Sequence, residues 1–205
     1  MEFLEAGVRK FKRDGFRKNR ALFRKLAKSQ SPRVLFITCA DSRVVAQLIT
    51  GTGPGDLFVE RNPGNIVPVH RRIAVGVSAS IEYAVDVLKV EHVVVCGHSD
   101  CGAVKGILHP EKLRSVPAVK RWLGFGDRAR QMLLRRGGKL TEPQQLERLT
   151  QLNVQVQLEH LETHPSVARR LKQRNISLHG WVYRIHDGEI LQMDPRTGDF
   201  LPWPW

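Results

Sequence analysis

The sequence predicts an α/β fold with a central, mainly parallel β-sheet that is flanked by helices. Two short runs, at residues 33–38 and 92–96, have the length and the apolar composition of buried parallel strands, and a further strand is expected at residues 56–60. Segments with a helical apolar period alternate with these runs. Near the end, Asp187-Gly188 separates two alternating segments, which indicates a late antiparallel hairpin formed by residues 178–185 and 189–193.

The predicted helices follow from periodicity and from Gly and Pro signals. We expect them at residues 43–50, 73–89, 115–136 and 143–162, with one more beginning at Cys101 and a short one from Pro165 to Arg174. Gly97 is predicted to end the third strand. Because we find no internal repeat and no linker, residues 1–205 are interpreted as one domain.

Residues 1–29 are predicted to form an N-terminal helical arm of two helices. One apolar stripe contains Phe3, Leu4, Val8 and Phe11, and the other contains Leu22, Phe23 and Leu26. Asp14-Gly15 marks the expected break between them. A single small domain rarely carries two exposed N-terminal helices with such apolar stripes, so we expect the arm to pack on a partner subunit.

Composition and charge limit the class of protein. With 41% hydrophobic and 26% charged residues, the chain has an ordinary globular composition, without a run long enough to cross a bilayer. The N-terminus lacks an apolar signal core, so we expect a cytoplasmic protein. The net charge of +13 suits anionic partners such as an acidic protein surface. Nucleic acid is not favoured, because the basic residues are dispersed and accompany no nucleic-acid-binding motif.

Potential metal ligands follow two predicted strands. Cys39 comes directly after the first strand, and His98 and Cys101 follow the third. In open α/β sheets ligands bind at the carboxyl ends of strands, so these side chains are expected to converge. Thiolate and imidazole are the ligands that zinc favours, and three of them leave a fourth position open, as a catalytic zinc needs. We therefore predict one Zn²⁺ per subunit.

Asp41 and Arg43 follow the first ligand directly and are the predicted catalytic pair. A carboxylate held by a guanidinium stays ionised and fixed in orientation, and it can only accept hydrogen bonds. Asp41 would then orient the oxygen on the metal towards the substrate. Alternatively, Asp41 leaves Arg43 and becomes the fourth zinc ligand, which closes the site. Because two thiolates neutralise Zn²⁺, we expect activity that rises towards alkaline pH.

The motifs C-x-D-x-R and H-x-x-C-G on these strands resemble those of the β-class carbonic anhydrases. The resemblance extends through residues 55–62, 81–85 and 178–183. It implies reversible hydration of CO2 to bicarbonate and a proton by zinc-bound hydroxide, with Cys39, His98 and Cys101 as zinc ligands. It also implies a homodimer or a higher even oligomer, and some relatives work inside carboxysomes.

Further site residues are implied by the resemblance alone. Gln30, Phe58 and Tyr83 match positions that line an apolar substrate cleft, and the backbone N–H of Gly102 matches a contact to bicarbonate. Arg61 and Tyr183 match two positions of a regulatory bicarbonate site. The third position of that site is a Trp in the relatives and is Phe36 here, which has no indole N–H to donate.

Several alternatives stay open from the sequence. The zinc can be structural with Asp41 as its fourth ligand, or the scaffold can hydrolyse carbonyl sulfide or carbon disulfide. A non-catalytic zinc- or bicarbonate-binding protein is the alternative from another class. Phe58 and Tyr83 can be plain core aromatics. Cys96, inside the apolar run of the third strand, is predicted to be an inert buried thiol.

Overall fold

The computed structural model describes residues 1–70, 75–135 and 139–203. The chain divides into two compact units, Met1–Ser31 and Pro32–Trp205. Each unit is described by itself.

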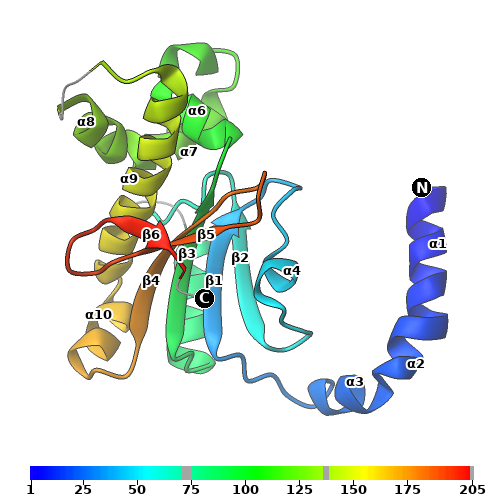
Figure 1. Ribbon diagram of the computed structural model, residues 1–205. Coiled ribbons are helices and arrows are strands. Elements are labelled where there is room, and N and C mark those ends of the chain that lie inside the picture. The colour runs from blue at the N-terminus through cyan, green and yellow to red at the C-terminus, as the bar shows by residue number, and fades with distance from the viewer. Residues whose placement is uncertain (71–74, 136–138, 204–205) are drawn as a thin grey trace. The chain divides into compact units, whose positions relative to one another are not determined.

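The larger unit is built on a six-stranded sheet with the strand order β2-β1-β3-β4-β5-β6 (Figure 1). The strands are β1 (Val34–Cys39), β2 (Leu57–Asn62), β3 (His92–His98), β4 (Ser177–Tyr183), β5 (Ile190–Met193) and β6 (Phe200–Pro202). Neighbours among the first four in this spatial order are parallel, whereas β5 and β6 pair antiparallel. The predicted α/β fold and the late hairpin are therefore confirmed.

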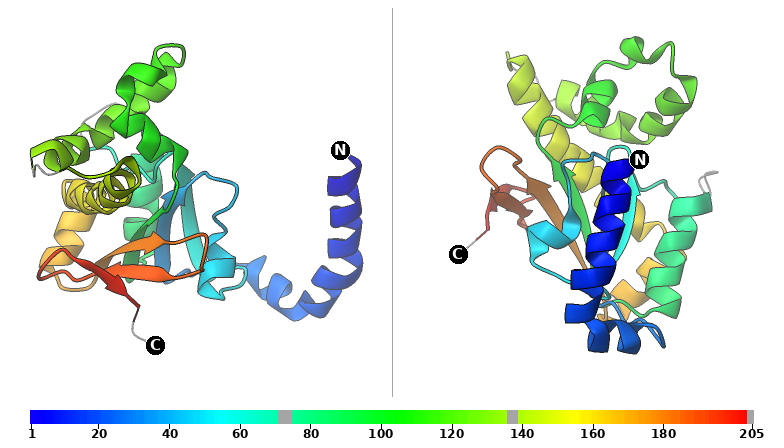
Figure 2. Two further views of the ribbon diagram at one scale, coloured as in Figure 1. Left: turned by 45° about the horizontal axis from the view of Figure 1, so that its top comes forward. Right: turned by 90° about the vertical axis from the view of Figure 1, so that its right-hand side faces the viewer.

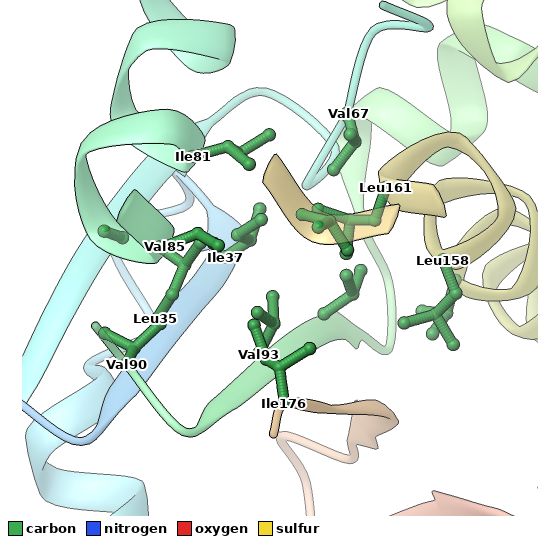
Figure 3. Packing of buried hydrophobic residues seen from close by; sticks show 14 of the residues in the cluster. Leu35, Ile37, Val67, Ile81, Val85, Val90, Val93, Leu158, Leu161 and Ile176 are labelled. Atoms are coloured by element: carbon green, nitrogen blue, oxygen red, sulfur yellow. The ribbon is translucent and has the colours of Figure 1, made fainter. Parts of the chain in front are cut away.

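One face of the sheet carries the main hydrophobic core. Leu35 and Val93 point from the strands towards helices α5 (Val75–Glu82) and α9 (Glu142–Glu162), and Leu161 of α9 joins the same cluster (Figure 3). Helix α10 (Pro165–Lys172) adds Val167 to it. Because these strands are buried on both faces, their sequences are continuous apolar runs and do not alternate between apolar and polar residues.

The opposite face of the sheet has a smaller apolar cluster. It contains Phe36, Val94 and Cys96, with Trp181 packed against it and Ala46 contributed by α4 (Ala46–Thr50). Helix α4 begins later than the predicted residue 43. The Asp41 side chain bonds the backbone N–H of Arg43 at 3.0 Å, and such a local side-chain bond competes with helix formation.

A group of helices covers the carboxyl edge of the parallel strands. It consists of α6 (Gly102–Leu108), α7 (Pro117–Leu123), α8 (Asp127–Arg135) and the start of α9 (Figure 2). The single helix predicted over residues 115–136 is wrong, because a 3₁₀ turn at Gly124–Gly126 interrupts it. A Cβ at Gly126 would lie 2.4 Å from Cδ1 of Ile107, so only glycine allows this close packing.

The third strand continues through Gly97 to His98, so the prediction that Gly97 ends it is wrong. Gly97 is required by packing instead. A Cβ there would lie 3.0 Å from Cγ2 of Val154 on α9. On the neighbouring strand, a Cβ at Gly180 would also lie 3.0 Å from Val154 and from Leu158. These two glycines let α9 lie close to the sheet.

The N-terminal unit is helical, as predicted, but its break is elsewhere. Helix α1 (Glu2–Lys10) continues through a π-helical turn at Phe11–Gly15 into α2 (Phe16–Lys18), and α3 (Arg20–Leu26) follows. The break falls at Asn19, with φ −109° and ψ 22°, rather than at Asp14-Gly15. Edge-to-face contacts of Phe11 with Phe16 and Phe23 hold the π-helical turn against α3.

Among the described residues, every helix is too short or too polar to span a membrane.

Candidate metal centre

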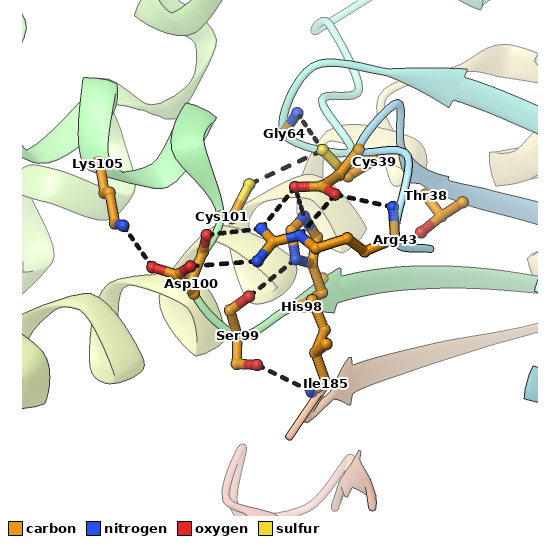
Figure 4. Close-up of polar contacts among 12 residues, drawn as sticks. Thr38, Cys39, Arg43, Gly64, His98, Ser99, Asp100, Cys101, Lys105 and Ile185 are labelled. Carbon is orange, nitrogen blue, oxygen red and sulfur yellow. Dashed lines mark hydrogen bonds and ion pairs between the residues drawn. The ribbon is translucent and has the colours of Figure 1, made fainter. Parts of the chain in front are cut away.

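Three buried side chains converge where β1 and β3 end. Cys39 is the last residue of β1 and His98 the last of β3, and these two strands are parallel neighbours. Cys101 lies in the loop that leads from β3 to α6. The ligand atoms of Cys39, His98 and Cys101 all lie within 4.8 Å of one another (Figure 4). The structure therefore brings together the three residues that the sequence nominated as metal ligands.

His98 is oriented for coordination. Its Nδ1 lies 2.9 Å from the backbone oxygen of Ser99, and this contact fixes Nδ1 as the N–H donor. Its Nε2 is buried and has no hydrogen-bond partner within the described residues. An orphaned buried nitrogen is costly unless it has a ligand. A bond from Nδ1–H to a backbone carbonyl is the usual support of a metal-binding histidine.

The sulfurs of Cys39 and Cys101 lie within hydrogen-bonding distance of each other. Cys39 Sγ lies 3.8 Å from Cys101 Sγ and accepts a 3.3 Å bond from the N–H of Gly64. The hydrogen bond with Cys101, together with that from the Gly64 N–H, lowers the pKa of Cys39. The same contact with Cys39, and burial, raise the pKa of Cys101. A divalent cation would let both sulfurs ionise, because its charge offsets their repulsion.

The donor set and its spacing fit zinc. Two Zn–S bonds of about 2.3 Å at a tetrahedral angle place the sulfurs about 3.8 Å apart. Cys39 Sγ and Cys101 Sγ are separated by that same 3.8 Å. With the free Nε2 of His98 as the third donor, Zn²⁺ would keep one coordination position for another ligand.

Asp41 lies beside this centre and is held by Arg43. Arg43 Nε donates to Asp41 Oδ1 at 2.9 Å and Nη2 donates to Oδ2 at 2.8 Å, which is a paired, bidentate contact. Asp41 Oδ2 lies 3.7 Å from Nε2 of His98. The hydrogen bonds from Arg43 hold the pKa of Asp41 well below its ordinary value, so this carboxylate accepts hydrogen bonds and does not donate them.

The outer side of Arg43 contacts a residue that the sequence did not nominate. Nη1 of Arg43 donates to Asp100 Oδ2 at 3.2 Å, and Nη2 donates to the backbone oxygen of Asp100 at 3.1 Å. Lys105 on α6 forms an ion pair with Oδ1 of Asp100. The sequence did contain one signal for Asp100, namely its position between His98 and Cys101. A residue inside a metal-binding motif lies near the metal site whatever its type.

Arg61 supports the backbone around Asp41. Its Nε donates to the carbonyl of Cys39 at 3.2 Å and its Nη2 donates to the carbonyl of Asp41 at 2.7 Å. Arg61 and Tyr183, the two predicted regulatory residues, belong to β2 and β4, which β1 and β3 separate. Phe36 is buried and packs edge-to-face on Trp181.

The loop after β2 is fixed by buried polar bonds that the sequence did not reveal. Asn153 Nδ2 on α9 donates to the carbonyl of Gly64 at 3.0 Å, and Gln157 Nε2 donates to Asn153 Oδ1 at 2.9 Å. The N–H of Val67 donates to Gln157 Oε1 at 2.8 Å. These bonds hold the Gly64 N–H in reach of the Cys39 sulfur.

The structure locates some of the predicted substrate-cleft residues relative to one another, but not all of them. The rings of Phe58 and Tyr83 lie 5.9 Å apart, and Tyr83 is exposed. Gly102 begins α6 directly after Cys101. Gln30 belongs to the N-terminal unit, so its share in a cleft stays a prediction.

A parallel α/β sheet with a buried Cys2His centre and a fixed carboxylate beside it has the donor set of a metal-dependent enzyme, and such donors suit a zinc site with an open coordination position. Comparison with known proteins gives the family. A family model described as "Carbonic anhydrase" matches residues 34–190. A carbonic anhydrase of Pseudomonas aeruginosa is 47% identical over 195 residues, which are 95% of this chain and 88% of the relative.

Solved structures agree. The β-carbonic anhydrase CcaA has a TM-score of 0.97 and 40% identity, over 100% of this chain and 92% of the other. One of two tetrameric β-carbonic anhydrases from Sordaria macrospora has a TM-score of 0.85 and 32% identity, over 98% of each chain. The chain belongs to the β-carbonic anhydrase family.

Proposed function

We propose that this chain catalyses the reversible hydration of CO2 to bicarbonate and a proton, with zinc held by Cys39, His98 and Cys101. The observation that carries the proposal is the buried triad itself. Its three donor atoms converge, and Nε2 of His98 has no hydrogen-bond partner among the described residues. Family membership supports the same reaction, since the relatives compared above are named carbonic anhydrases.

Zinc, when bound, supplies Lewis acidity that makes a water molecule an effective nucleophile near neutral pH. The chain's own contribution is orientation. Asp41, fixed by Arg43, accepts the hydrogen bond of the attacking water at Oδ2, so a lone pair of that water is directed away from Asp41 and towards the carbon of CO2. The Arg43 guanidinium keeps Asp41 ionised throughout, because protonation of Asp41 would break the bidentate pair.

An apolar cleft would receive CO2. Phe58 and Tyr83 are proposed to line it, and the Gly102 N–H is proposed to contact the bicarbonate product, whereas the role of Gln30 stays a prediction from the sequence. Adjacent rings of Phe58 and Tyr83 support this assignment. Asp41 as a fourth zinc ligand in a closed state remains part of the proposal.

A regulatory bicarbonate site at Arg61 and Tyr183 stays a sequence prediction. Arg61 already bonds two backbone carbonyls, and Phe36 offers no N–H donor.

A homodimer or a higher even oligomer is proposed, with the arm at residues 1–29 packed on a partner subunit. Phe3 is 77% and Val8 66% exposed in the single chain, and these side chains would be covered in such an assembly. The Sordaria relatives are described as tetrameric. A cytoplasmic or carboxysomal location and an acidic protein partner remain predictions from the sequence.

Stopped-flow CO2 hydration by protein with measured zinc, scanned from pH 6 to pH 9, tests the proposed reaction. We expect turnover that rises with pH. Asp41→Asn should keep one zinc per chain and lose about 100-fold in kcat/KM, because the amide can donate as well as accept. Glu111→Gln, at an exposed carboxylate beside His109, is the control and should match the wild type.

The alternatives have distinct outcomes in the same experiments. Stoichiometric zinc without turnover at any pH would contradict the proposal and favour a zinc- or bicarbonate-binding protein. Sulfide released from carbonyl sulfide or carbon disulfide faster than CO2 is hydrated would instead indicate the hydrolase.

A further inference from the structure

Arg43 lies between two carboxylates that come from different loops. On one side it holds Asp41 through Nε and Nη2. On the other side Nη1 and Nη2 donate to the carboxylate and the carbonyl of Asp100. The guanidinium is thus held by hydrogen bonds on both sides (Figure 4).

Asp100 is itself held in place. Its backbone has φ 56°, in the left-handed region that Asp tolerates better than most residues. This conformation lies between two metal ligands, and the carbonyl and the side chain of Asp100 both reach Arg43 from it. Lys105 pairs with Oδ1, which leaves Oδ2 for Arg43.

Arg43 needs such support because its own position is exposed. The side chain of Arg43 is 44% exposed, whereas that of Asp41 is 17% exposed. A single exposed ion pair holds a long side chain weakly, since solvent competes for both partners. Several charges joined in one network hold it better, and here Arg43 and Lys105 alternate with Asp41 and Asp100.

We propose that Asp100, held by Lys105, is a positioning residue that keeps Arg43 paired with Asp41. While Arg43 is held, Asp41 stays directed at the attacking water. When Arg43 is released, Asp41 loses its partner and is free to move onto the metal. The inference rests on the proposed function, and it assigns to Asp100 and Lys105 a role that neither the family motif nor the metal geometry supplies.

The local surroundings make a clean test available. Asp100 and Lys105 form part of the wall of a cavity of about 420 Å³, so shorter side chains there leave no new void in a packed core. Asp100→Gly is the sharpest variant, because glycine adopts a positive φ freely. It retains the backbone carbonyl that faces Arg43 and removes only the carboxylate.

We expect zinc-loaded Asp100→Gly to keep one zinc per chain and to lose about tenfold in kcat with little change in KM. Asp100→Asn retains one oxygen acceptor and the tolerance of positive φ, so it should recover part of the loss. Lys105→Met should fall between Asp100→Asn and the wild type. Glu91→Gln is the matched control, because Glu91 is a carboxylate of similar exposure, 50% against 59%, paired with Arg33 at the other end of β3.

A crystal structure of zinc-loaded Asp100→Gly gives a readout that does not depend on turnover. We expect Arg43 turned away from Asp41 and the Asp41 carboxylate moved towards the zinc. An unchanged Asp41–Arg43 pair with wild-type kcat would overturn the role of Asp100. If the wild type does not hydrate CO2 but Arg43 still moves in the variant, the proposed function is wrong and the positioning role stands.

Discussion

At the scale of single residues, Cys96 and Cys39 show how position determines the chemistry of a thiol. Cys96 lies on the inner part of β3, and burial raises the pKa of its thiol to about 12. It therefore stays protonated and donates to the carbonyl of Gly97 at 3.4 Å. Cys39, two residues from Asp41, lies at the strand end and has a lowered pKa. One thiol is suited to packing and the other to binding a cation.

This contrast predicts opposite effects of two similar substitutions. Cys101→Ala should reduce zinc from one per chain to well below 0.1 after dialysis against a weak chelator, roughly as expected for loss of one of three ligands. Cys96→Ala should retain the zinc and lose about 1 kcal/mol of stability, because it removes only one buried sulfur. Elemental analysis and urea unfolding measure both. Loss of zinc in both variants would contradict the assignment of Cys101 to the metal site and of Cys96 to packing.

The site residues that could be predicted from the sequence are those that belong to a short motif. Cys39, His98 and Cys101 follow the strands that the apolar runs predict, and Asp41 and Arg43 come shortly after Cys39. The contacts of Asp100 were not predictable, because they depend on a positive φ at this residue that no sequence pattern indicates. Asn153 and Gln157 were equally hidden, since they reach the loop after β2 from a helix about 90 residues away.

At the scale of elements, the packing of α9 on the sheet depends on Gly97 and Gly180. Gly180→Ala would place a Cβ 3.0 Å from two side chains of α9, and we expect a loss of about 1–3 kcal/mol. Gly76→Ala in α5 is the control, because a Cβ there meets nothing within 4 Å. It should be neutral or stabilising by about 0.5–1 kcal/mol. Equal effects in urea unfolding would contradict the close approach of α9.

The start of α10 predicts a pH dependence of stability. His164 is buried and its Nε2 donates to the carbonyl of Pro68 at 2.9 Å. Burial lowers the pKa of His164 in the folded chain. The contribution of neutral His164 to the free energy of unfolding is therefore complete above the unfolded pKa of about 6.5. It is lost as pH falls, because the unfolded chain binds the proton more readily than the folded chain does.

His164→Gln keeps a donor for Pro68 but removes the titration. We expect the wild type to lose more stability than the variant between pH 7.5 and pH 5.5, by at most about 1.4 kcal/mol per pH unit for one proton. Urea unfolding at both pH values checks this. Parallel losses in the two proteins would mean that His164 does not contribute.

Element boundaries were the part of the fold that the sequence predicted least well. The interruption of the helix at Gly124–Gly126 follows from a close contact with Ile107, a tertiary cause. The break of the arm at Asn19 follows from a π-helical turn that moves it past Gly15. Strand β6 was not predicted, because three residues that include Pro202 carry little strand signal and pair only through β5.

At the scale of the whole molecule, the arm is expected to determine assembly. Deletion of residues 1–29 should lower the molecular mass in light scattering from that of an even oligomer towards that of a smaller one, because the exposed apolar side chains of the arm are removed. A milder variant, Phe3→Glu with Val8→Glu, should act in the same direction. Lys12→Glu is the matched control for added charge. An unchanged mass in the deletion would contradict a role of the arm in assembly.

The positions of the three proposed zinc ligands also link metal supply to folding. Cys39 ends one strand and His98 ends its parallel neighbour, although 58 residues lie between them in the chain. The centre can therefore exist only after these distant segments have paired, and the unfolded chain offers no comparable site. Any free energy of zinc binding is then added to the free energy of folding. Growth in zinc-poor medium should accordingly reduce the amount of intact protein as well as its activity.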